Sequence, residues 1–141
     1  MISAQSITKR FGNFVAVDSV SFEVAPGEIL GFIGPNGAGK TTTMRMLTGF
    51  LPASEGRAVV AGHDVFDEPM KVRRKVGYLP EKPPLYNDLT IGAYLDFVAE
   101  IRGIDRSKRV RRVGEVMDQV GLIGWEHRIL GSLSKGYRQR V

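Results

Sequence analysis

A glycine-rich stretch from Gly34 to Thr41 constrains this chain more than any other feature. It reads Gly-Pro-Asn-Gly-Ala-Gly-Lys-Thr and fits G-x-x-x-x-G-K-[ST], the pattern of a phosphate-binding loop. The apolar run 28–33 before it has the length of a buried strand, and residues 42–50 after it place apolar side chains at helical spacing. A glycine-rich turn with an exposed lysine is the alternative. The order strand, loop, helix favours phosphate binding.

The residue types of this loop suit the binding of a nucleotide with Mg²⁺. Glycines let backbone N–H groups close around phosphates, and the helix that follows turns its positive end toward them. Lys40 would add a point charge on the β- and γ-phosphates as a catalytic group, and the Thr41 hydroxyl would complete a Mg²⁺ shell. The residues expected to hold the phosphates are Gly34, Pro35, Asn36, Gly37, Ala38, Gly39, Lys40, Thr41 and Thr42.

Composition limits the classes of protein that remain. The 141 residues are enough for one domain, and the absence of cysteine excludes disulfides and thiolate metal sites. We see neither a leader nor an apolar run of about eighteen residues, so a cytoplasmic location is expected. The net charge of +5 comes from basic clusters at 71–75 and 102–112. The two clusters are typical of solvated helix faces rather than of a nucleic-acid or anionic-lipid surface, because no aromatic residues lie among the basic ones to stack on bases. No nucleic-acid partner is therefore expected.

Hydrophobic periodicity predicts an α/β chain. Beside the run before the loop, we expect strands at 2–8, 20–24, 57–61 and 76–80, and a short helix at 70–75.

Two longer helices are predicted in the last third. The first would have Thr90 as its N-cap and bury Ile91, Tyr94, Leu95, Val98 and Ile101. The second would be capped by Asp105 and end at Gly121, with its apolar stripe on Val110, Val113, Met117 and Val120.

A second motif, Leu-Ser-Lys-Gly-Tyr-Arg-Gln-Arg-Val, occupies 133–141, about ninety residues after the loop. Together with GPNGAGKTTT at 34–43, it closely resembles the nucleotide-binding subunit of an ATP-binding cassette transporter, over essentially the whole chain. That family's signature is usually Leu-Ser-Gly-Gly-Gln, from which Lys135 and Tyr137 depart. This segment, in combination with a glutamate at position 81, resembles exporter-type cassettes, including those of gliding motility, multidrug resistance and sodium export.

The resemblance implies a P-loop NTPase cassette. It would have an N-terminal antiparallel β subdomain, a partial parallel-sheet core and an inserted helical subdomain. Residues 1–141 would be the N-terminal part of one such domain: 1–88 the β subdomain and loop core, 89–132 the helical subdomain and 133–141 the signature.

The resemblance also implies roles for residues outside the loop. Phe11 matches the aromatic residue on which adenine stacks, with Phe14 as the alternative, and Val17 matches a contact near the ribose. Ser134 and Gly136 would meet the γ-phosphate of ATP bound to a second copy, in a head-to-tail homodimer with ATP at the interface.

Residues 77–81 match the loop that links core and helical subdomain, where the family usually ends on glutamine. Here the residue is Glu81. A carboxylate at this position would bind Mg²⁺ and act on the hydrolytic water, although it also adds negative charge near the γ-phosphate. An exposed loop carboxylate is the alternative.

The function implied is that of an ATPase subunit that couples ATP binding and hydrolysis to transport by a separate membrane permease. The permease would dock near 81–88 and hold the subunit on the inner face of the cell membrane. A cassette ATPase of translation or DNA repair is the alternative, and a P-loop kinase or GTPase is a third. Neither the transported substrate nor the direction of transport can be read from the chain.

In the resembled family, an Asp-Glu pair ending a later strand and a histidine beyond it serve hydrolysis. These positions would follow Val141, and no apolar run followed by Asp-Glu occurs within the chain. We therefore expect a cassette truncated after its signature, which alone does not turn over ATP.

Overall fold

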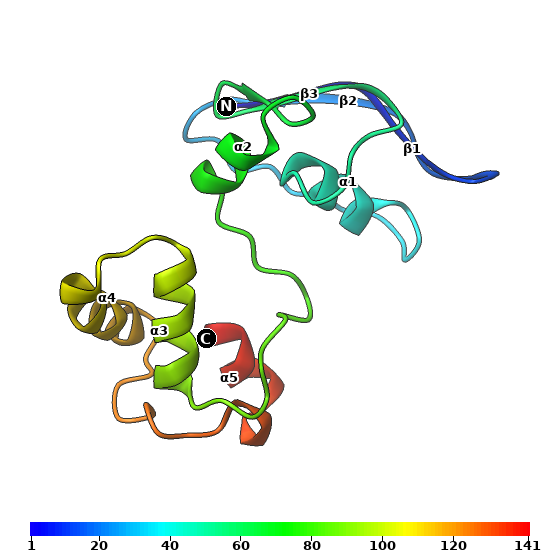
Figure 1. Cartoon of the computed structure of the whole chain (residues 1–141). Helices are drawn as coiled ribbons and strands as arrows, with labels where there is room; N and C mark the ends of the chain where they lie inside the picture. Colours follow the sequence, from blue (N-terminus) through cyan, green and yellow to red (C-terminus); the bar gives the residue numbers. More distant parts are fainter. The chain divides into compact units, whose positions relative to one another are not determined.

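The computed structural model describes all 141 residues, in two compact units, residues 1–78 and residues 79–141 (Figure 1). No helix in either unit has the length and apolar character that a bilayer crossing requires.

The first unit is built on an antiparallel sheet. Its strands are β1 (Ile2–Phe11), β2 (Phe14–Val24), β3 (Glu55–Val60) and β4 (His63–Asp64), in the order β2-β1-β3-β4. The β1–β2 hairpin pairs Ile2 with Val24 and closes at Phe11 and Phe14. The antiparallel β subdomain is thus confirmed, with strands longer than the sequence predicts because the hairpin continues to its tip.

Two irregular positions interrupt the long hairpin. Ser6 and Ser19 have positive φ values of 48° and 46°, at points where the strand register shifts. Side chains of the opposite strand satisfy the displaced amides: Ser6 N–H donates to Ser21 Oγ at 2.7 Å, and Ser19 N–H donates to Thr8 Oγ1 at 2.9 Å. The bulges therefore leave neither amide without a partner.

Two helices cover one side of this sheet. These are α1 (Lys40–Leu47), which follows the glycine-rich loop, and α2 (Pro69–Lys75), which begins with the proline expected at a helix start (Figure 1). Their apolar side chains and those of the sheet form the core of the unit. It consists of Ala4, Ile7, Val17, Met46, Leu47, Ala58, Val60, Val65 and Val72.

The runs 28–33 and 76–80 are not strands, which corrects two of the sequence predictions. Both lack regular secondary structure, and Ile29 and Ile33 are each 96% exposed. A strand is held by hydrogen bonds to a neighbouring strand. No strand of this chain pairs with either run. Leu30 and Leu79 are exposed as well, whereas Phe32 and Val76 are half-buried by packing on Phe22 and on the core. The sheet of this structure is antiparallel throughout, and the predicted parallel pairing does not occur in it.

The second unit is helical. It contains α3 (Ile91–Ile101), α4 (Arg106–Gln119), the 3₁₀ turn η1 (Leu130–Ser132) and α5 (Lys135–Arg140). Thr90 caps α3 as predicted, since its Oγ1 accepts the Ala93 N–H at 3.2 Å. The core of the unit consists of Ile91, Leu95, Met117, Leu122, Leu130 and Leu133.

Three details of this unit differ from the sequence predictions. Asp105 precedes α4 but makes no capping hydrogen bond; its carboxylate lies 3.7 Å from Lys108 Nζ instead. Ile101 and Val110 are 65% and 85% exposed. Ile101 ends α3, and Val110 lies in the second turn of α4, so the apolar spacing of each helix extends to a position that is not buried.

Candidate functional site

Gly39 is the residue that fixes the shape of the glycine-rich loop. Its φ of 80° lies in the left-handed region, and a Cβ at this position would stand 2.4 Å from the Ala16 carbonyl oxygen and 2.9 Å from Val17 Cγ2. Both conformation and space therefore demand glycine. Gly37 has a similar φ of 84°, but a Cβ there would meet nothing within 4 Å. The end of the loop is thus pressed against β2, whereas its middle is open.

The Lys40 side chain spans the loop. Its Nζ donates to the carbonyl oxygens of Gly34 at 2.6 Å and Pro35 at 2.7 Å, and the Ala38 N–H also donates to Pro35 O at 3.3 Å. The ammonium group therefore lies against the backbone of the loop for which the sequence predicts phosphate binding.

The start of α1 supplies donors to the same place. The first four N–H groups of a helix, counted from its N-cap, have no acceptor within the helix. Here they are those of 39–42, since the Thr43 N–H already donates to the Gly39 carbonyl at 2.8 Å. Thr43 is 1% exposed and turns its hydroxyl back to the Gly39 carbonyl at 3.0 Å. The neighbouring Thr41 is exposed, which leaves its hydroxyl for an ion or ligand.

The three predicted nucleoside contacts come from the β1–β2 hairpin. Val17 is 5% exposed and lies against Gly39, so the structure joins it to the loop. Phe11 and Phe14 are cross-strand partners at the hairpin tip, 50% and 64% exposed. Lys9 Nζ lies 5.4 Å from the Phe11 ring centre. The structure gives neither phenylalanine a contact with the loop.

The signature residues lie at the start of α5 in the second unit. Ser134 is the N-cap, and its Oγ accepts the Tyr137 N–H at 3.4 Å. A Cβ on Gly136 would meet nothing within 4 Å. Packing inside this unit therefore gives no reason for glycine at 136, in contrast to Gly39.

Glu81 and Lys135, the two charged residues that depart from the pattern of the resembled family, lie close together. Glu81 Oε1 lies 3.7 Å from Lys135 Nζ, with the two side chains 81% and 72% exposed. The Glu81 carbonyl oxygen also accepts from Gln139 Nε2 at 3.4 Å. A cleft of about 370 Å³ is lined here by Glu81, Lys82, Pro83, Lys135 and Arg138. The sequence alone does not indicate this pairing, because the partners come from distant segments.

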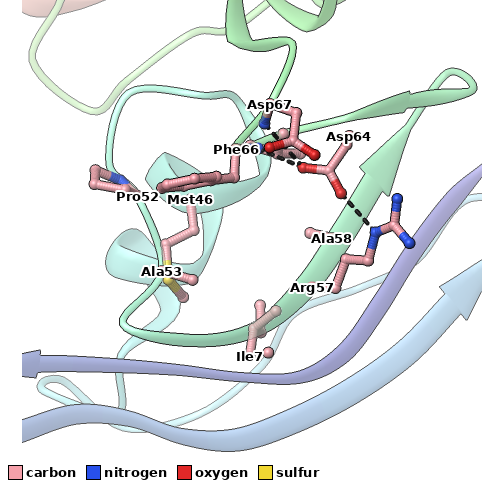
Figure 2. A pocket seen from close by; sticks show the side chains of 11 residues that line it. Ile7, Met46, Pro52, Ala53, Arg57, Ala58, Asp64, Phe66 and Asp67 are labelled. Atoms are coloured by element: carbon pink, nitrogen blue, oxygen red, sulfur yellow. Dashed lines mark hydrogen bonds and ion pairs between the residues drawn. The ribbon is translucent and has the colours of Figure 1, made fainter.

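A second pocket lies between α1 and the sheet of the first unit, away from the loop glycines (Figure 2). At its edge Arg57 Nε donates to Asp64 Oδ2 at 2.6 Å, and Asp64 Oδ1 accepts the N–H groups of Phe66 at 2.8 Å and Asp67 at 3.1 Å (Figure 2). Burial opposes ionisation of Asp64, but these hydrogen bonds outweigh it and lower the pKa of its carboxyl. This carboxylate secures the turn after β4.

The fit to a Mg²⁺–nucleotide rests on the loop itself. No group of three or more His, Cys, Asp or Glu side chains in this chain is arranged to hold a metal ion. Beside a nucleotide, Mg²⁺ takes few protein ligands and completes its shell with water and phosphate oxygens, so a preformed cluster is not required. Thr41 offers its hydroxyl as one such protein ligand.

Comparison with solved structures identifies the fold. A structure described as the ATP binding subunit of an ABC transporter superimposes with a TM-score of 0.83 and 28% identity, covering 99% of this chain and 58% of the other. A dimeric ATP-binding cassette, MJ0796, described as bound to ADP and Pi in a post-hydrolysis state, superimposes with a TM-score of 0.86 and 23% identity, covering 99% and 66%. The predicted cassette fold is confirmed.

Sequence comparison identifies the family. The ATP-binding protein YxlF of Bacillus subtilis, described as part of an ABC transporter, is 37% identical over the whole of this chain, which spans 46% of YxlF. The profile of the family described as ABC transporter matches residues 17–141. The chain that carries the glycine-rich loop, the hairpin beside it and the signature helix belongs to the ABC transporter family.

Proposed function

We propose that this chain binds ATP with Mg²⁺ as the ATP-binding part of a transporter. The observation that carries the proposal is the junction of Gly39 and Lys40. There a left-handed glycine, an ammonium group over the loop carbonyls and the free amides of α1 converge. Positive groups held by the backbone in this way suit the β- and γ-phosphates of a nucleotide.

Within this proposal each loop residue has a separate task. Lys40 exchanges its two carbonyl contacts for phosphate oxygens, and the amides from Gly37 to Thr42 surround the same group. Thr41 holds the metal, which when bound neutralises charge on the phosphates and orients them for transfer to water. Val17 supports the loop from β2, beside the ribose.

The base is proposed to stack on Phe11, with Phe14 as the alternative ring. Both rings are exposed at the hairpin tip, so either has a free face to offer. Stacking of a base on an aromatic ring contributes about 1–3 kcal/mol in nucleic-acid complexes. A Phe11→Ala variant that binds ATP normally, beside a Phe14→Ala variant that does not, would reassign the contact.

A second copy of the chain is proposed to complete the site, head to tail. Ser134 uses its oxygen to accept the Tyr137 N–H, which leaves the hydroxyl proton free to donate to a γ-phosphate oxygen. The space around Gly136 supports close approach of a phosphate. The cassette MJ0796, which has the same fold, is described as dimeric, and this is compatible with pairing of two copies.

Because the chain spans under half of YxlF, hydrolysis and coupling are proposed for the whole protein. Glu81 would contact the metal and the attacking water. The segment 81–88 would meet a membrane permease, and thereby hold the protein at the inner face of the membrane.

The direct test is ATP affinity. Lys40→Ala should weaken Mg²⁺–ATP binding by at least tenfold, measured by calorimetric titration of the chain, because a hydrogen bond to a charged group contributes about 1.5–3 kcal/mol. Lys75→Ala, the same substitution on α2 of the same unit, is the matched control and should bind as the parent does. Equal affinities of both variants would rule out the site.

A further inference from the structure

Trp125, the only tryptophan of the chain, lies against the signature helix. Its ring stacks on that of Tyr137, with centroids 4.3 Å apart and planes inclined by 16°. The guanidinium of Arg128 lies 5.1 Å from the Trp125 ring centre, and that of Arg140 lies 5.1 Å from the Tyr137 ring centre. Two aromatic rings and two cations thus form one cluster, in which each contact is individually favourable.

This cluster attaches α5 to the rest of its unit through apolar contact. The helix has six residues and none of them is fully buried, and so short a helix does not persist without packing. Tyr137 is one of two α5-segment side chains that pack on the hydrophobic core of the unit, the other being the terminal Val141. The Trp125–Tyr137 stack therefore helps to orient α5, beside the polar contacts that Lys135 and Gln139 make with Glu81.

Tyr137 also connects the stack to Ser134. Its backbone N–H donates to Ser134 Oγ at 3.4 Å, and the next N–H, that of Arg138, donates to Ser134 O at 3.0 Å. Fixing the ring of Tyr137 thereby fixes the position of the serine hydroxyl. In the signature that this segment resembles, the equivalent residue is glutamine, which has no aromatic face to stack.

We propose that Trp125 is a positioning residue for the signature, which acts by stacking on Tyr137 and so holds Ser134 and the start of α5 in place. The consequence for nucleotide rests on the proposed function, in which Ser134 donates to the γ-phosphate. The positioning of Ser134 and α5 does not rest on the proposed function. Positioning and its effect on nucleotide binding are therefore measured in separate experiments.

The positioning is tested with Tyr137→Leu, which removes the aromatic face, and Tyr137→Phe, which keeps it. Tyr137→Leu should shift the Trp125 emission to the red and abolish the near-ultraviolet dichroism of the pair. It should also speed amide exchange at residues 137 and 138 by roughly two- to tenfold, the worth of one aromatic pair. Tyr137→Phe should restore all three signals. Unchanged protection of α3 amides shows that the unit is folded.

If amide exchange at residues 137 and 138 is as slow in Tyr137→Leu as in the parent, the positioning role is overturned. The same exchange measurement on Trp125→Phe and Trp125→Ala gives an independent reading, since phenylalanine should preserve protection and alanine should lose it.

The link to nucleotide is tested by titrating Mg²⁺–ATP while recording Trp125 emission. A change in the parent that is absent from Lys40→Ala supports the link. If ATP binds with Lys40 dependence and the emission stays constant at concentrations that pair two copies, the stack does not serve the phosphate. If ATP does not bind at all, the proposed function fails, while the exchange data still decide the positioning role.

Discussion

The glycine-rich loop and the signature segment are held in place by different means. Backbone geometry secures the loop: a left-handed Gly39 against the Ala16 carbonyl, and carbonyl groups that accept from Lys40. Side chains secure the signature, through the Trp125–Tyr137 stack and the exposed Glu81–Lys135 pair. A backbone arrangement fails when one atom is added, whereas side-chain contacts can be exchanged for others. This explains why the loop fits its motif without exception while the signature departs from its own at Lys135 and Tyr137.

The largest expected effect is that of Gly39→Ala. A methyl group would overlap the Ala16 carbonyl in a conformation that alanine avoids, and together these should destabilise the first unit by roughly 3 kcal/mol. Gly37→Ala also places alanine in a left-handed conformation but creates no overlap, so it should destabilise the first unit by only about 1 kcal/mol. Amide exchange of β1 and β2 measures the loss, and Trp125 emission reports the second unit as internal control. Equal effects of the two variants would show that the loop is not pressed against β2.

A smaller effect is expected from Asp64→Asn, which tests the ion pair between Arg57 and Asp64 in the first unit. The Arg57–Asp64 contact is 2.6 Å long and Asp64 is 11% exposed, so loss of the charge should cost about 1–3 kcal/mol. The side-chain oxygen of asparagine can still accept the N–H groups of Phe66 and Asp67, so the substitution removes the charge alone. Asp67→Asn, at a neighbouring carboxylate, serves as the control.

The pH dependence has a defined sign. The pKa of Asp64 is lower in the folded state than in the unfolded chain, so its stabilisation is present above about pH 4 and is lost as the pH falls through the folded value. The melting temperatures of the parent and Asp64→Asn should thus differ at pH 6, and the difference should shrink as the pH is lowered below about 4. A difference in melting temperature that does not change with pH would contradict the lowered pKa of Asp64.

The contrast also shows which parts the sequence could predict. The loop, the strands at 2–8 and 20–24 and the Thr90 cap depend on residues close in the chain, and the sequence predicts all three. The antiparallel β subdomain was expected from the family resemblance alone. The strands at 28–33 and 76–80 were predicted from apolar runs alone, but a strand also needs a partner, and no strand in this structure pairs with Ile29 or Ile33. The Glu81–Lys135 contact joins distant segments, which periodicity does not reveal. Site roles for Phe11 and Glu81 stay predictions.

A still smaller effect should come from the Glu81–Lys135 pair. Because both side chains are largely exposed, their coupling in a double-mutant cycle of Glu81→Gln and Lys135→Met should be about 0.2–1 kcal/mol. Denaturation followed by Trp125 emission measures it in the unit concerned. The coupling should fall in about 1 M salt, where the screening length is only about 3 Å. A salt-independent coupling would indicate that the contact is not ionic.

The smallest effect on folding is expected at Gly136, where the comparison with Gly39 is sharpest. A Cβ at 136 has no neighbour within 4 Å and the φ of this residue is not positive. Since alanine is the better helix former, Gly136→Ala should leave stability unchanged or raise it by up to about 1 kcal/mol. If Gly136 instead serves the approach of a phosphate bound to a second copy, the same variant should lose ATP-dependent pairing in sedimentation experiments while still binding ATP at Lys40. Pairing that survives in a stable Gly136→Ala chain would mean that neither folding nor the proposed ATP interface requires glycine at this position, and the proposed role of the signature would have to rest on Ser134 alone.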